Sequence, residues 1–173
     1  MPQTLLAVCA ILAFSFFALS QHRANKHIGE LALASEIELA ATDVARDQLT
    51  DITSYLFDED DIGRSGLRTD PAGLSVIGPD AGETDRSLFD DMDDFDGFLD
   101  SLSVDWHGAP IQFAITADVR YVDPLQPDVG VAGPTLAKEI AVTVMEQATT
   151  ADRPRVTARL IQVVTPAWRA MQG

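Results

Sequence analysis

The N-terminal stretch from Met1 to Gln21 carries no charged side chain and is almost wholly apolar. At about 1.5 Å per residue, a helix of this length is able to cross a hydrocarbon core about 30 Å thick. A secretory signal is a poorer match, because no basic residues precede the stretch and no cleavage-site pattern clearly follows it. We therefore predict that residues 4–20 form a helix surrounded by lipid or by other apolar helices.

The helical pattern continues beyond the apolar stretch. From Gln21 to Phe57 there is no proline, and Gly29 is the only glycine. Small and apolar residues recur at steps of three and four, which places them on one face of a helix. They are Ile28, Leu31, Ser35, Leu39, Thr42, Ala45, Leu49, Ile52 and Leu56. We predict one helix over residues 1–57, apolar on all sides in 4–20 and amphipathic in 21–57.

The C-terminal part of the chain alternates with a period of two, which indicates half-buried strands. The segments are "PIQFAITADVRYVD", "KEIAVTVME" and "RVTARLIQVV", with a short earlier strand near residues 102–106. Successive strands without intervening helices predict an antiparallel meander over 101–166, and the long helix is the available cover for its apolar face. The expected fold class is α+β: a long N-terminal helix on a small antiparallel sheet of three to four strands, with residues 58–173 forming the globular domain.

Charge is distributed unevenly. The chain has a net charge of -15, and residues 58–100 hold 14 acidic residues against three arginines. Such a surface repels phosphate backbones, so no nucleic-acid partner is expected. No nucleophile elbow or phosphate-binding glycine loop occurs, and the clustered carboxylates lack the contrasting environments of an acid–base pair. The single cysteine, Cys9, excludes an intrachain disulfide. We predict a protein that is not an enzyme and has no cofactor other than the calcium considered next.

The stretch "SLFDDMDDFDGF" contains five aspartates, and apolar residues occur among them at every third position. One hypothesis is a calcium site, since carboxylate oxygens suit this hard cation. Its ligands are Asp91, Asp93, Asp94 and Asp96. The spacing does not match an EF-hand, and an unmatched acidic run is usually a hydrated face. The second and favoured hypothesis is therefore a solvated acidic loop. Its acids face water, and its anchors are Phe89, Met92, Phe95 and Phe98.

The order of these features resembles a known family. A long N-terminal helix, "LFDDMDDFDGF", "FAITADVRYVD" and "KEIAVTV" together look like the type IV pilin-like proteins, and among them the minor pilins of mannose-sensitive haemagglutinin type. The resemblance implies a structural subunit of a cell-surface filament, anchored in the inner membrane before assembly and bound to copies of itself through residues 4–56. The alternative is a single-pass membrane-anchored minor pseudopilin, or an assembly or interaction factor, with an acidic ectodomain.

The chain departs from the pilin pattern at its N-terminus. Pilins carry a short basic leader ending in glycine, then a phenylalanine, with a glutamate at the fifth mature position. Here the sequence starts Met-Pro-Gln-Thr-Leu, and no acidic residue precedes Glu30. Either a leader has been removed or the protein is a divergent one that does not use it, and the missing glutamate puts the usual register contact between subunits in doubt. In addition, Arg23 and Lys26 follow the apolar stretch, and a positive-inside count alone would leave the C-terminal domain in the cytoplasm. The resemblance implies the opposite orientation, which we adopt.

Overall fold

The computed structural model describes residues 2–61, 67–106, 108–147 and 154–166. The chain forms two compact units, residues 1–37 and residues 38–173. One helix, α1 (Pro2–Ile52), runs through the first unit and into the second. The predicted long helix is therefore confirmed, although it ends before Phe57.

The first unit is helical throughout its described residues. Its apolar side chains lie on all sides of the helix and are exposed: Leu5 is 71% exposed, Phe14 72% and Phe16 77%. By length and composition, α1 is able to cross a membrane, and it is the one such helix in the described residues. Alanine and leucine favour the helical backbone here, and no proline interrupts it after Pro2, which a first turn tolerates.

The second unit buries one face of α1. Ala41, Ala45 and Ile52 are fully buried and Leu49 is 8% exposed, at helical steps of four, four and three. The predicted stripe is thus confirmed at Ala45, Leu49 and Ile52. It is wrong at Leu39, which is 63% exposed, because the buried face runs through the small side chains of Ala41 and Ala45 instead.

The helix stops early because polar side chains compete for its last carbonyls. The Thr53 hydroxyl donates to Thr50 O at 3.1 Å, and the Ser54 hydroxyl donates to Asp51 O at 2.6 Å. Serine and threonine offer the backbone such alternatives at helix ends. The chain then leaves the helical path, and Phe57 and Asp58 become buried outside it.

The sheet contains five antiparallel strands in the described residues, one more than the largest number predicted. They are β1 (Phe98–Trp106), β2 (Ala109–Asp123), β3 (Gln126–Gly130), β4 (Lys138–Glu146) and β5 (Thr157–Val164). The order is β1-β2-β4-β5, with β3 paired to the end of β2. β3 lies between two of the predicted strands, in a segment for which no strand was predicted. The Asp123 carboxylate accepts from Leu125 N at 2.8 Å and closes the turn that forms this hairpin.

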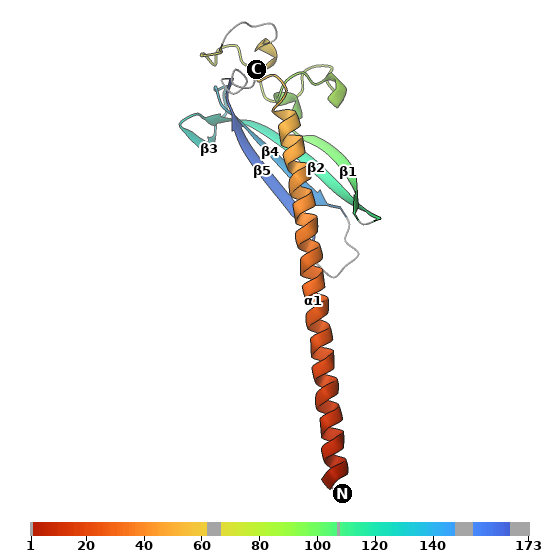
Figure 1. The fold of residues 1–173 in the computed structure, drawn as a ribbon. Coiled ribbons are helices and arrows are strands. Elements are labelled where there is room, and N and C mark those ends of the chain that lie inside the picture. The colour runs from red at the N-terminus through yellow and green to blue at the C-terminus, as the bar shows by residue number, and fades with distance from the viewer. Residues whose placement is uncertain (1, 62–66, 107, 148–153, 167–173) are drawn as a thin grey trace. The chain divides into compact units, whose positions relative to one another are not determined.

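The predicted alternation of buried and exposed residues is confirmed in β2. In β2, Phe113, Ile115, Ala117, Val119 and Tyr121 are buried and alternate with more exposed residues. Ile140, Val142 and Val144 are buried in β4 as well, but Glu139 and Ala141 between them are also buried, so this strand is covered on both faces at its start. In the second unit, α1 from Glu38 onward lies across this apolar face, and the segment between α1 and β1 gathers near the C-terminal end of α1 (Figure 1). That segment contains the aspartate run.

Candidate functional site

The apolar residues of the aspartate run anchor it to the second unit, as predicted. Phe95 is fully buried and Met92 is 2% exposed. Phe89 and Phe98 are half-buried and make edge-on contacts with Phe95, with ring centroids 5.0 and 5.6 Å away. The short 3-10 turn η3 (Asp93–Phe95) lies between these anchors. The three-residue spacing therefore gathers the rings on one side of the run.

The favoured expectation that the acids face water is wrong for three of them. Asp91, Asp93 and Asp94 are 3%, 2% and 4% exposed. Backbone N–H groups satisfy part of their charge: Asp94 accepts from Asp90 N at 3.0 Å and from Asp91 N at 3.2 Å, and Asp91 accepts from Asp93 N at 2.8 Å. Such local bonds are typical of aspartate, and they fold the run back on its own backbone.

A buried lysine compensates much of the remaining negative charge of these aspartates. Lys138 is the first residue of β4 and is fully buried. Its Nζ contacts a carboxylate oxygen of Asp93, lies 2.5 Å from Phe57 O, and is 3.7 Å from Asp58 Oδ2. The rings of Phe57 and Tyr121 face the same atom, with centroids 4.7 and 5.3 Å away, as in cation–π contacts.

Sequence reasoning missed Lys138, although a signal for it existed. Lys138 has the same parity in its strand as Ile140, Val142 and Val144, so the alternation that buried those residues also points the lysine inward. A buried lysine almost always requires an acidic partner. The partner is Asp93, which lies 45 residues away in the sequence.

Further polar residues complete the group that we call the Lys138 cluster. Asp58 is fully buried, and Arg68 Nη2 lies 3.9 Å from its Oδ1. The Ser75 hydroxyl lies 2.5 Å from Asp93 Oδ2 and 3.0 Å from Asp58 Oδ2. The Lys138 cluster comprises Asp58, Arg68, Ser75, Asp91, Asp93, Tyr121 and Lys138. It joins the end of α1, the 67–75 segment, the aspartate run and the sheet.

Burial controls the charge of this cluster. It raises the pKa of Asp91 to about 9, and a carboxyl–carboxyl hydrogen bond with Asp93 adds to the shift. Asp91 is therefore neutral at pH 7, and the carboxyl groups of Asp58 and Asp93 face two basic side chains. Burial also raises the pKa of Tyr121, whose hydroxyl donates to Ser75 O at 3.0 Å. The cluster is thus closed, polar and nearly balanced in charge.

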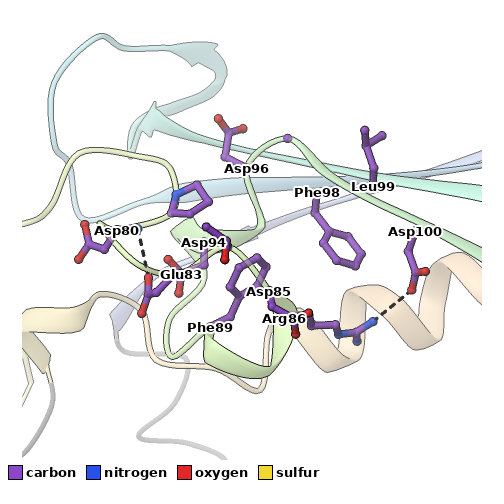
Figure 2. A pocket seen from close by; sticks show the side chains of 13 residues that line it. Asp80, Glu83, Asp85, Arg86, Phe89, Asp94, Asp96, Phe98, Leu99 and Asp100 are labelled. Atoms are coloured by element: carbon purple, nitrogen blue, oxygen red, sulfur yellow. Dashed lines mark hydrogen bonds and ion pairs between the residues drawn. The ribbon is translucent and has the colours of Figure 1, made fainter.

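A second acidic group lies on the outer side of the run. Carboxylate oxygens of Glu83, Asp90 and Asp94 lie within 4.8 Å of one another. Figure 2 shows the open pocket beside them, whose lining includes Glu83 and Asp94 together with Asp80, Asp96 and Arg86. Arg86 points away from these carboxylates and pairs instead with Asp51 at 2.5 Å and Asp100 at 3.7 Å. The group therefore retains its repulsion.

Repulsion among the carboxylates around this pocket raises the pKa values of several of them. A carboxyl–carboxyl hydrogen bond with Asp80, together with the charge of Asp80, raises the pKa of Glu59 to about 7. A hydrogen bond to Asp94 raises the pKa of Glu83. Burial and then the charges of Asp94, Asp80 and Asp93 raise the pKa of Asp90. Like charges that cannot separate hold protons more tightly.

The four aspartates predicted to bind calcium do not converge on one point. Asp91 and Asp93 belong to the Lys138 cluster, whereas Asp94 belongs to the outer acidic group. Asp96 accepts from Val119 N at 3.0 Å and so binds β2. At Asp91 and Asp93 a divalent cation would meet the ammonium of Lys138 at close range. Calcium binding by these residues stays a prediction.

Comparison of the chain with protein-family models, curated proteins and solved structures finds no match. Its architecture has the general pilin-like form: a long N-terminal apolar helix whose later residues pack on an antiparallel sheet. The helix is consistent with membrane anchoring or with assembly.

Proposed function

We propose that this protein is a structural subunit of a type IV pilus-like extracellular filament, assembled through its N-terminal helix. The observation that carries the proposal is the exposed apolar surface on all sides of α1 before residue 21, on a helix whose later turns pack against the sheet of the second unit. A helix that is apolar all round requires a non-aqueous surrounding. A bilayer supplies it before assembly, and the helices of other copies supply it in a filament.

The second half of α1 supports the proposal with further exposed apolar side chains. Ile28, Leu31 and Leu39 are 63%, 57% and 63% exposed, although their spacing places them on one stripe. Leu39 precedes Ala41 by two residues, so its side chain lies roughly 200° around the helix from that of Ala41, whereas Ile28 and Leu31 lie on turns that precede those packed on the sheet. A soluble monomer gains nothing from these side chains, whereas a packed bundle of copies buries them.

The filament proposal is tested on protein sheared from the surface of cells that make it. Electron microscopy should show long polymers without bound membrane. A variant with Ile28→Gln, Leu31→Gln and Leu39→Gln should keep its thermal unfolding curve in detergent and lose the polymers. Leu125→Gln is the matched control, because Leu125 is 90% exposed in a β-hairpin turn of the second unit. Material that consists only of vesicle-bound monomers, or polymers that persist in the triple variant, would refute the proposal.

The second candidate is a membrane-anchored minor pseudopilin or assembly factor. Arg23 and Lys26 at the end of the apolar segment favour a stable position at the membrane surface, where basic residues flank membrane spans. Abundance separates the two functions: a filament subunit is plentiful in sheared material, and an assembly factor stays with the membrane fraction. Protease digestion of intact cells then establishes the side on which the acidic unit lies. Neither function involves turnover of a substrate.

A further inference from the structure

The contact between Lys138 and Asp93 brings an amine nitrogen against a carboxyl group, the two groups that form an amide bond. The Nζ atom of Lys138 touches one carboxyl oxygen of Asp93, and the Ser75 hydroxyl holds the other oxygen at 2.5 Å. Both reacting side chains are fixed by packing, with exposures of 0% for Lys138 and 2% for Asp93. We propose that Lys138 and Asp93 condense after folding to form an intramolecular amide bond between Nζ and Cγ.

Proximity supplies the first requirement of this reaction. An amine and a carboxyl group held in contact react as one molecule, and effective molarities in such pairs are very large. The contact joins residues 45 positions apart and depends on the fold. An unfolded chain therefore does not form the bond, and the folded chain needs no enzyme to form it.

Exclusion of water supplies the second requirement. Condensation releases a water molecule, and bulk water drives the reverse reaction. The rings of Phe57 and Tyr121 face the lysine nitrogen at 4.7 and 5.3 Å, and neither Lys138 nor Asp93 has more than 2% exposure. A closed site with two aromatic rings against the nitrogen disfavours the return of water.

Asp91 supplies the third requirement, a proton carrier. Its carboxyl group is hydrogen-bonded to that of Asp93 and is 3% exposed. A neutral carboxyl group at this point is able to donate a proton to one oxygen while its other oxygen accepts one, as general acid–base catalysis requires. Asp58, at 3.7 Å from Nζ, stabilises positive charge on the nitrogen during the reaction.

The step balances without a co-reactant. The ammonium of Lys138 passes one proton to the Asp93 carboxylate, and the nitrogen lone pair attacks Cγ to form the N–C bond. Asp91 then protonates the departing oxygen and receives the second proton from nitrogen, so the C–O bond breaks and water leaves. One ammonium and one carboxylate become one neutral amide and one water, and Asp91 ends in its starting state.

The bond would tie the start of β4 to η3 and close the intervening chain into a covalent ring. The bond requires neither a filament nor a membrane, so its test is independent of the test of the proposed function. Its physical effect is to restrict the unfolded chain, as a disulfide does in proteins that have one. This chain has a single cysteine and no intrachain disulfide of its own.

The test uses full-length protein, purified in detergent and then fully denatured. The chain has two lysines, Lys26 and Lys138, so trypsin and an amine-reactive label report on each one separately. In the wild-type protein, Lys26 should be labelled and cleaved, whereas Lys138 should resist both. The peptide around Lys138 should be joined to the peptide around Asp93, with a mass lower than their sum by one water.

Two variants test separately whether the bond forms and whether Asp91 catalyses its formation. Asp93→Ala should restore labelling and cleavage at Lys138, while Lys26, whose ion pair with Glu30 is exposed, is the internal control in every sample. Asp91→Asn keeps the shape of the side chain and should leave most molecules unlinked. Linkage at wild-type levels in Asp91→Asn would overturn the role of Asp91. Full labelling of Lys138 in denatured wild-type protein, with no joined peptide, would overturn the proposal as a whole.

Discussion

The carboxylate of Asp96 accepts a hydrogen bond from Val119 N at 3.0 Å, and this contact fastens the aspartate run to β2. Val119 is 3% exposed, so no bulk water replaces the acceptor. Gly97, at φ +74°, follows directly and turns the chain into β1, a backbone conformation that glycine adopts without strain. The run is therefore held to the sheet at its C-terminal end.

Asp96→Ala should lower the free energy of unfolding by about 1–3 kcal/mol, because it leaves the buried Val119 N–H without a partner. Asp96→Asn keeps an oxygen acceptor at the same place and should lose much less. Thermal and denaturant unfolding of the two variants, compared with wild type, measures the difference. Equal losses in both would show that the charge of Asp96, and not the hydrogen bond, is what matters.

Chelation should leave the melting temperature unchanged. Lys138 already occupies Asp93, as an ion pair or as the proposed amide, so removal of calcium takes nothing away from the Lys138 cluster. If Asp91, Asp93, Asp94 and Asp96 did hold calcium, a chelator would lower the melting temperature, since roughly 1 kcal/mol corresponds to about 2–8 °C in domains of this range of sizes. Scans with a chelator, with calcium and with magnesium distinguish the two cases.

The same geometry reverses one expectation drawn from the sequence. If the loop were solvated, changing Asp93 and Asp94 to asparagine would relieve repulsion and stabilise the protein slightly. In the structure Asp93 pairs with a buried lysine, and breaking such a pair costs about 3–5 kcal/mol. Asp93→Asn should therefore destabilise strongly. Asp90→Asn removes a like charge from the outer acidic group and is the matched control, with a small stabilising effect expected.

Stability should fall as the pH rises from about 4.5 to about 7. The pKa of Glu59 rises from 4.5 to about 7 on folding, so in this window the folded state binds more protons than the unfolded state. The contribution of Glu59 to stability is fully present below pH 4.5 and is lost by about pH 7. Asp91 likewise lowers stability as the pH rises, up to about pH 9. Glu59→Gln should flatten the curve of melting temperature against pH, and Glu38→Gln on α1 should not. Added salt should reduce the slope by screening. A slope of opposite sign would contradict the assignment.

A charge in the apolar segment should abolish both membrane residence and assembly. Phe14 is 72% exposed on α1, and Ala13 lies beside it. An aspartate at either position costs about 2.5 kcal/mol or more in a bilayer, and a filament repeats the cost in every copy. Cell fractionation and electron microscopy of Ala13→Asp and Phe14→Asp measure the two outcomes. Ala132→Asp, in the loop before β4, is the control. Normal filaments from Phe14→Asp would mean that the segment is not a packed core.

The spacing of apolar residues along the sequence predicted the helix and most of the strands well. The alternation around Phe113 and Ile140 fixed which side of each strand faces the helix, because side-chain direction in a strand depends only on position. The stripe on α1 was predicted less well. Ala41 looks unremarkable in sequence, yet it lies at the centre of the buried face, since a helix can approach a sheet closely only where its side chains are small.

The site was harder to predict because its contacts are distant in sequence. Asp93 is one of five similar aspartates, and nothing local distinguishes it from Asp94. The distinction comes from Lys138, and from Phe57 O, which lies 81 residues before the lysine that it binds. The sequence alone therefore predicts a hydrated surface for the acidic run, whereas tertiary packing places the Lys138 side chain behind it.

The continuity of α1 has a mechanical consequence. Tension applied to its apolar segment is carried along the ladder of backbone hydrogen bonds to Ala45, Leu49 and Ile52, which are embedded against the sheet. Gly29 is the one glycine in the helix, and glycine is about 1 kcal/mol less favourable there than alanine. Under load the helix should therefore begin to extend at Gly29, so that the first lengthening leaves the anchored turns and the sheet folded.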